Sequence, residues 1–233
     1  MKPLNVKQDA AAITVVGDGF AVTFDRATGF IRALERDGKN LLAAEGGPRL
    51  HLWRAAHKTD DMWAFNDWKR CGLLNPAWRL VSLTAQQAGP VAVRVIASLE
   101  LQGAAGFSVG HTAAYTVYGD GSIAVDNCVT PQGKRIPLAR LGVRLLLDPS
   151  LDRFTYLGRG PMENYADRKR GSDIGLYTST VRGNMTPYAK PMENGNHEDV
   201  RWAAVTGKGR GGVLAQAVGG GVLQAGVLPY TDE

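Results

Sequence analysis

The chain has 233 residues, of which 44% are hydrophobic and 21% charged, a balance that excludes bulk disorder and is ordinary for a globular protein. Its formal net charge is +5, but the basic residues are scattered, and no run has the length typical of a nucleic-acid-binding patch. We therefore expect no nucleic-acid partner. Glycine accounts for 29 residues, well above the usual share of about 7%, which indicates many turns between short strands.

Cysteine usage and hydropathy narrow the class further. The two cysteines, Cys71 and Cys128, make neither a disulfide framework nor a metal site. The first residues contain no apolar segment of the signal-peptide type, and no window reaches about 18 apolar residues. We therefore expect a cytoplasmic location, no membrane partner, no metal and no cofactor.

Short strand signals open the chain. Residues 12–16 are apolar and rich in β-branched side chains, and residues 19–24 alternate between apolar and other positions. Residues 25–29 predict a turn, and residues 30–34 a third strand. Together these segments predict an antiparallel meander.

Residues 46–79 form a long irregular connection that holds four of the five tryptophans. We expect a short helix around Asp61–Cys71. The aromatic residues either pack under the loop or serve a function, since long ordered loops often do. His57 with Asp60 and Asp61 offers a cation site, although a lone histidine among tryptophans is more often structural.

Strand signals then resume. Strands are predicted at 91–101 and 110–118, and Gly119-Asp120-Gly121 predicts a hairpin leading to a strand at 122–129. Further strands are predicted at 139–147, 154–158, 200–206, 212–218 and 221–227. With about a dozen strands and hardly any helix, the sequence predicts an all-β fold, a large antiparallel sandwich that forms one domain over residues 1–233.

Polar residues concentrate between 158 and 202, where the tetrapeptide Pro-Met-Glu-Asn occurs at 161–164 and again at 191–194. Two interpretations of this repetition are open. The two similar loops face one groove, or the repetition is a coincidence. Such amides, carboxylates, arginines and aromatic rings suit sugar hydroxyls, and the alternative is a buried polar network that fixes long loops to the sandwich. The candidate carbohydrate-binding residues are Glu163, Asn164, Tyr165, Arg168, Glu193, Asn194, Asn196, His197, Arg201 and Trp202.

Two catalytic interpretations use the same region. Glu163 and Glu193 offer the residue types of a retaining glycosidase pair, which needs two carboxyls close together. His197 with Glu193 or Glu198 offers an acid and a base for chemistry on a hexose ring. No nucleophile elbow, phosphate loop or dinucleotide fingerprint accompanies these residues.

The order of several motifs resembles the C-terminal β-sandwich domain of the bacterial β-galactosidases of glycoside hydrolase family 2, also called the β-galactosidase small chain. The most specific match is Tyr-Leu-Gly-Arg-Gly-Pro-Met-Glu-Asn-Tyr-Ala-Asp-Arg at 156–168. Six further segments carry the resemblance in the same order, at 19–25, 48–55, 115–121, 186–188, 191–197 and 199–202.

The resemblance implies a galactose-mutarotase-like supersandwich that packs beside a catalytic (β/α)8 barrel and lends loops to the rim of its galactoside pocket. In the family the two catalytic glutamates lie on that barrel. The resemblance therefore implies that Glu163 and Glu193 anchor loops or line a groove. It makes the barrel and a carbohydrate the expected partners.

Two departures from the family pattern matter. The family usually continues Trp-Arg-Ala with a proline and an Asp-Asn-Asp triplet, whereas residues 56–61 read Ala-His-Lys-Thr-Asp-Asp. Family members also continue through further strands after the point where this sequence ends. We therefore expect a sheet that lacks its last strands and has exposed edges, at which another copy of the chain is a candidate to pair.

Three functions follow from these observations. The leading one is an accessory domain that supports hydrolysis of β-galactosides by a separate barrel. The alternative is a free-standing hexose epimerase or hydrolase that uses His197 with Glu193 or Glu198. The third is a structural module whose polar loops only build a protein interface.

Overall fold

The computed structural model describes residues 1–57, 63–190 and 192–232. Strands dominate these residues, and every pairing between neighbouring strands is antiparallel. The all-β prediction is therefore confirmed. The finer supersandwich architecture stays a prediction.

The chain divides into two compact units. Unit 1 comprises residues 1–53 and 58–148, and unit 2 comprises residues 54–57 and 149–233. The expectation that they make one domain stays a prediction.

Unit 1 contains three antiparallel sheets. A five-stranded meander follows the chain in the order β1 (Asn5–Gln8), β2 (Ala12–Gly17), β3 (Phe20–Asp25), β4 (Ile31–Arg36) and β5 (Lys39–Asn40). A four-stranded sheet has the order β10-β9-β8-β7, made of β7 (Trp78–Gln87), β8 (Ala92–Gln102), β9 (Phe107–Tyr118) and β10 (Ile123–Gly133). A two-stranded sheet joins β6 (Arg49–His51) to β11 (Gly142–Arg144).

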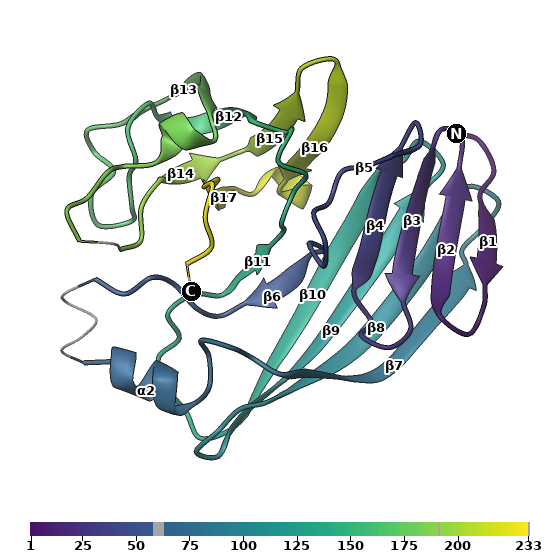
Figure 1. The fold of residues 1–233 in the computed structure, drawn as a ribbon, viewed down its shortest axis with the longest axis horizontal. Coiled ribbons are helices and arrows are strands. Elements are labelled where there is room, and N and C mark those ends of the chain that lie inside the picture. Colours follow the sequence, from purple (N-terminus) through teal and green to yellow (C-terminus); the bar gives the residue numbers. More distant parts are fainter. Residues whose placement is uncertain (58–62, 191, 233) are drawn as a thin grey trace. The chain divides into compact units, whose positions relative to one another are not determined.

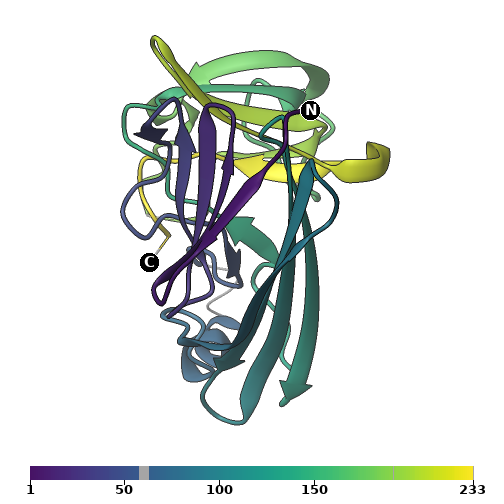
Figure 2. The same cartoon turned by 90° about the vertical axis from the view of Figure 1, so that its right-hand side faces the viewer.

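The two larger sheets of unit 1 face each other across a hydrophobic core (Figures 1 and 2). Val15 and Phe24 of the meander belong to the same buried cluster as Val95 and Tyr115 of the second sheet. The rings of Phe24 and Tyr115 meet edge to face, with centroids 5.3 Å apart. Alternating apolar positions on both sheets therefore produce a β-sandwich, as their period of two predicts.

The tryptophan-rich connection packs around the short helix α2 (Phe65–Arg70), which lies within the range predicted for it. Trp68 is fully buried, its indole N–H donates to the carbonyl of Pro137 at 2.7 Å, and its ring lies 6.3 Å from that of Trp53. This arrangement supports the packing interpretation of these aromatic residues. The cation site suggested at His57 depends on Asp60 and Asp61, which lie outside the described residues.

Unit 2 contains a four-stranded sheet and a separate strand pair. The sheet has the order β13-β12-β15-β16, made of β12 (Arg153–Gly160), β13 (Asp173–Thr180), β15 (Trp202–Gly207) and β16 (Arg210–Gln216). The pair joins β14 (Asn196–Val200) to β17 (Leu223–Gly226). Two short 3-10 turns, η1 (Arg182–Asn184) and η2 (Val218–Gly220), complete the unit.

Two strand predictions need correction, and several strands were missed. The strand expected at 139–147 shrinks to the three residues of β11. The strand expected at 200–206 is broken at Arg201, because β14 ends at Val200 after an irregular register and β15 begins at Trp202. No strand was predicted at β1, β5, β6, β7 or β13.

Within the described ranges, no helix combines the length and the apolar character needed to cross a bilayer.

Candidate functional site

The candidate site of unit 2 rests on the buried face of β12. Phe154 and Tyr156 are both buried on this face, with their rings stacked 4.9 Å apart. Gly158 continues the face, and a Cβ placed there would lie 2.7 Å from Cγ2 and 3.0 Å from Cα of Val200. The glycine therefore allows β14 to approach β12 closely.

His197 on β14 lies against this aromatic face and is only 1% exposed. Its ring centroid is 4.2 Å from that of Tyr156. Nδ1 lies 3.0 Å from the carbonyl oxygen of Arg159, and Nε2 lies 2.8 Å from Oδ1 of Asn184. Burial lowers the pKa of the imidazole, although the Arg159 carbonyl and the Glu163 carboxylate oppose this shift. Both ring nitrogens are therefore engaged inside the protein.

Asn164, from the first Pro-Met-Glu-Asn segment, is completely buried. Its Nδ2 donates to the carbonyl oxygens of Arg159 at 3.0 Å and Met162 at 2.9 Å, and its Oδ1 accepts from the backbone N–H of Glu198 at 2.9 Å. Asn196 in turn donates from Nδ2 to the backbone carbonyl of Asn164 at 2.8 Å. These amides join β12 to β14 and satisfy the backbone of both.

Glu163 clamps the loop after β12 to the loop before β14. Its Oε1 accepts hydrogen bonds from Nη2 of Arg168 at 2.7 Å and from the Tyr188 hydroxyl, and its Oε2 accepts from the backbone N–H of Gly195 at 2.7 Å. The side chain is only 7% exposed. Burial raises the pKa of this carboxyl, but the hydrogen bonds from Tyr188, Gly195 and Arg168 outweigh it and hold the pKa below its usual value.

Each Pro-Met-Glu-Asn segment contains the same local hydrogen bond, from its asparagine side chain to the carbonyl of its methionine. Nδ2 of Asn164 donates to the carbonyl of Met162 at 2.9 Å, and Nδ2 of Asn194 donates to the carbonyl of Met192 at 3.0 Å. The glutamates differ, because Glu193 is half-buried and its backbone N–H donates to the carbonyl of Ala55 at 3.1 Å. The repetition thus corresponds to the same asparagine turn used twice, in loops that the Glu163 clamp holds together.

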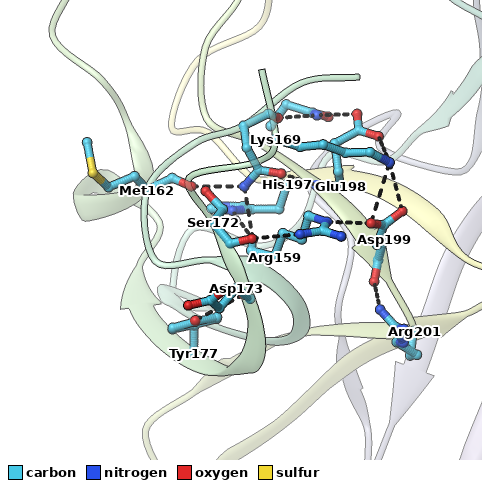
Figure 3. A network of polar contacts seen from close by, with 12 residues as sticks. Arg159, Met162, Lys169, Ser172, Asp173, Tyr177, His197, Glu198, Asp199 and Arg201 are labelled. Atoms are coloured by element: carbon cyan, nitrogen blue, oxygen red, sulfur yellow. Dashed lines mark hydrogen bonds and ion pairs between the residues drawn. The ribbon is translucent and has the colours of Figure 1, made fainter. Parts of the chain in front are cut away.

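A charged network, whose partners the sequence did not identify, lies beside these loops (Figure 3). The carboxylate of Asp199 accepts from Nε of Arg159 at 2.5 Å and from Nζ of Lys169 at 3.2 Å. Arg159 also donates from Nη1 to the carbonyl of Ser172 at 2.8 Å. The hydrogen bonds from Arg159 and Lys169 lower the pKa of the Asp199 carboxyl.

Asp199 also sits in unusual backbone, with a φ of +52° within β14. This left-handed conformation coincides with the shift in register between His197 and Val200. Aspartate tolerates the conformation better than most residues. The backbone carbonyl of Asp199 accepts a hydrogen bond from Nη1 of Arg201 at 2.5 Å. Both the side chain and the backbone of Asp199 are therefore held by hydrogen bonds.

The predicted carbohydrate-binding residues separate into buried and accessible groups. Asn164, Asn196 and His197 are buried, and Glu163 is nearly so. Glu193, Asn194, Tyr165 and Trp202 are half-buried, whereas Arg168 and Arg201 are exposed.

Among the accessible residues, Arg168 and Tyr165 lie together, whereas Trp202 lies on another surface. The Arg168 guanidinium lies 4.6 Å from the ring centroid of Tyr165, so this pair shares a surface beside Glu163. Trp202 pairs with Leu157, one position along β12 from Tyr156. Because side chains alternate along a strand, Trp202 lies on the sheet face opposite Tyr156 and His197.

The similarity to known proteins agrees with this arrangement of motifs. Residues 16–233 match the family model of the beta galactosidase small chain. The chain belongs to the β-galactosidase small-chain family. The resemblance inferred from the ordered motifs is therefore confirmed.

Three relatives show how the chain compares with longer members of the family. The β-galactosidase of Priestia megaterium (strain DSM 319 / IMG 1521) is 32% identical over 98% of this chain. The β-galactosidases of Lactobacillus delbrueckii subsp. bulgaricus and Kluyveromyces lactis are 28% and 26% identical over 92% and 90% of it. In each case the match covers 21% of the relative's own length. The chain thus spans about a fifth of the length of these relatives.

Proposed function

We propose that the chain is the accessory, carbohydrate-handling part of a β-galactosidase. In this proposal it supports hydrolysis of terminal β-D-galactosides by a separate catalytic (β/α)8 barrel, in the cytoplasm. One observation carries the proposal: nearly the whole chain matches a relative named β-galactosidase while covering only 21% of it. A region several times longer is therefore available to hold the catalytic machinery.

The geometry of unit 2 supports an accessory role over a free-standing enzyme. A glycosidase carboxyl needs oxygen atoms that reach the sugar, whereas both oxygens of Glu163 accept hydrogen bonds inside the protein. An epimerase or hydrolase based on His197 with Glu193 or Glu198 needs an accessible imidazole, but His197 and Glu198 are buried. These groups are better suited to holding the loops than to proton transfer.

Sugar contact in this proposal falls to the accessible edge of the clamp. Arg168 is held by Glu163 and stacked on Tyr165, so its guanidinium has a fixed orientation. A fixed guanidinium donates readily to ring hydroxyls, and such positioning costs little entropy on binding. We place a contribution to the rim of the galactoside pocket at this pair.

The outer face of the unit 2 sheet is the proposed contact with the rest of the enzyme. Leu176 and Leu214 are 65% and 57% exposed, and they share this face with Leu157 and Trp202. Contiguous exposed apolar residues mark interaction surfaces. The occupant that fits is the region of the β-galactosidase outside this chain, since the chain accounts for a fifth of the relatives' length.

A chimera tests the proposal. The segment of the Priestia megaterium enzyme that matches this chain is deleted, or replaced by the chain itself, and hydrolysis of o-nitrophenyl β-D-galactoside is measured. We expect the deleted enzyme to be inactive and the chimera to be active. A chimera that is soluble and folded but does not hydrolyse the substrate would contradict the accessory role.

A further inference from the structure

The outer face of the four-stranded sheet of unit 1 carries a hollow of about 390 Å³, lined in part by Glu100, Gly110, Thr112 and Thr130. Its volume falls in the range of small-molecule sites, which is roughly 300–1,000 Å³. We propose that this hollow is a second binding site, separate from the loops of unit 2, for a neutral polyhydroxylated ligand the size of one hexose ring. This inference does not depend on the function proposed above.

The floor of the hollow is a glycine that the fold does not require. Gly110 lies in the middle of β9, paired with Glu100 of β8 and Thr130 of β10. It is not among the glycines with positive φ. A Cβ placed on it would meet only Nε2 of Gln132 at 3.6 Å and atoms of Thr130 from 3.8 Å, which is ordinary contact. Glycine inside a strand weakens the strand, and it often marks a place where a ligand approaches the backbone.

A second irregularity of the same sheet borders the hollow. The register between β7 and β8 shifts between Leu80 and Ser82, which leaves Val81 as an extra residue. Val81 lines the hollow and is 57% exposed. Bulges reorient single side chains. Gly110, which has no side chain, and Val81, whose side chain is reoriented by the bulge, therefore border the same hollow.

The walls select the chemical class of the ligand. Thr112 and Thr130 contribute hydroxyls, and Gln132 contributes an amide, so donors and acceptors are both present. The carboxylate of Glu100 is already paired with Arg79. Because this pair is neutral as a whole, the hollow neither requires a cation nor attracts an anion.

Sugar rings match this set of groups. Each ring hydroxyl both donates and accepts, as the threonines and the glutamine require. The C–H face of a ring is apolar and suits the isopropyl group of Val81. A fixed carboxylate accepts hydrogen bonds from two neighbouring hydroxyls. We therefore infer a monosaccharide ring, or one ring of a longer saccharide, as the occupant.

Amide NMR of the full chain tests the site. Methyl β-D-galactopyranoside and methyl β-D-glucopyranoside are each titrated into the 15N-labelled protein. We expect at least one of them to give saturable shifts centred on the amides of Gly110, Thr112 and Thr130. If neither probe gives saturable shifts at these residues, the proposal is wrong.

Three variants separate binding from folding. Gly110→Val fills the hollow and is expected to weaken binding at least tenfold. Thr130→Val keeps the shape of an exposed side chain, removes only its hydroxyl, and is expected to weaken binding measurably even if Gly110→Val fails to fold. Thr84→Val on β7, which does not line the hollow, serves as the matched control and is expected to bind like the parent chain. Unchanged binding in both hollow variants overturns the proposal.

Discussion

The carboxylate of Glu163 accepts the backbone N–H of Gly195 at 2.7 Å, and the two residues are 32 positions apart in the chain. This bond connects the two loops that carry the repeated Pro-Met-Glu-Asn segment. Charged hydrogen bonds of this kind are stronger than neutral ones, and this one is shielded from solvent. Glu163 is therefore the central anchor of the candidate site.

Replacement of Glu163 is expected to loosen unit 2. In Glu163→Gln an NH2 group replaces one carboxylate oxygen, so a donor that bonded to that oxygen loses its acceptor. We therefore expect the free energy of unfolding to fall by about 2 kcal/mol. Urea denaturation followed by tryptophan fluorescence measures the change. Glu45→Gln is the matched control, because the Glu45 side chain is 87% exposed, and its change should stay within about 0.5 kcal/mol. Equal effects of the two substitutions would show that the clamp contributes nothing.

Close approach of β14 to β12 predicts intolerance of a side chain at Gly158. In Gly158→Ala the new Cβ overlaps Val200, partly against its backbone, so we expect a loss of about 1–3 kcal/mol in the free energy of unfolding. Gly171→Ala is the control, since a Cβ there meets nothing within 4 Å and the residue lies outside the positive-φ region. Thermal or urea denaturation compares the two variants. A Gly158→Ala protein as stable as Gly171→Ala would contradict the packing described.

His111 in the core of unit 1 predicts a fall in stability at acid pH. Its Nε2 donates to Oδ1 of Asn127 at 2.9 Å, and its buried Nδ1 has no hydrogen-bond partner in the part of the chain that the structure describes. Burial lowers the pKa of the imidazole, which the bond to Asn127 opposes only in part. Protonation is thus easier in the unfolded chain, so this contribution to stability is complete above about pH 6.5 and decreases as the pH falls below it.

Urea denaturation at pH 7.5 and pH 5.5 measures that dependence. We expect the parent chain to lose stability at the lower pH, and His111→Gln to lose less between the same two values. An identical pH dependence in the two proteins would exclude His111 as its source.

The outer face of the unit 2 sheet predicts a phenotype that appears only in the larger enzyme. Leu176→Asp and Leu214→Asp alter exposed side chains, so we expect changes within about 0.5 kcal/mol in the stability of the isolated chain. In the chimera each substitution is expected to lower galactoside hydrolysis severalfold by placing a charge in an apolar contact. Val218→Asp, at an exposed position outside the four-stranded sheet, is the control and should leave activity unchanged. Full activity of both leucine variants would move the contact to another face.

Regular alternation made most of unit 1 predictable from sequence. β2 and β3 pair along their whole length, as do β9 and β10 on either side of the Gly119-Asp120-Gly121 hairpin. β7 was not predicted because the bulge at Val81 interrupts its alternation. Leu80 and Leu83 are three positions apart and do not fit a period of two. β13 escaped because its apolar residues Ile174 and Leu176 are the exposed ones.

The candidate site was predictable in its residues but not in its contacts. The repeated tetrapeptide identified Glu163 and Asn164, and the structure shows why both are held in place. Asp199 was missed as a site residue, because its ion pairs with Arg159 and Lys169 span 40 and 30 positions of the chain. No local pattern encodes pairing at such separations, since Arg159 and Asp199 lie on different strands and Lys169 lies between β12 and β13.

The proposed support of a separate catalytic region by this chain is tested by galactosidase activity in parallel samples. The purified chain, the Priestia megaterium enzyme lacking its matching segment, and the chimera of the two are each assayed with o-nitrophenyl β-D-galactoside. We expect activity in the chimera alone. Turnover by the purified chain, abolished by Glu193→Gln or His197→Gln, would contradict it and make the chain an enzyme in its own right.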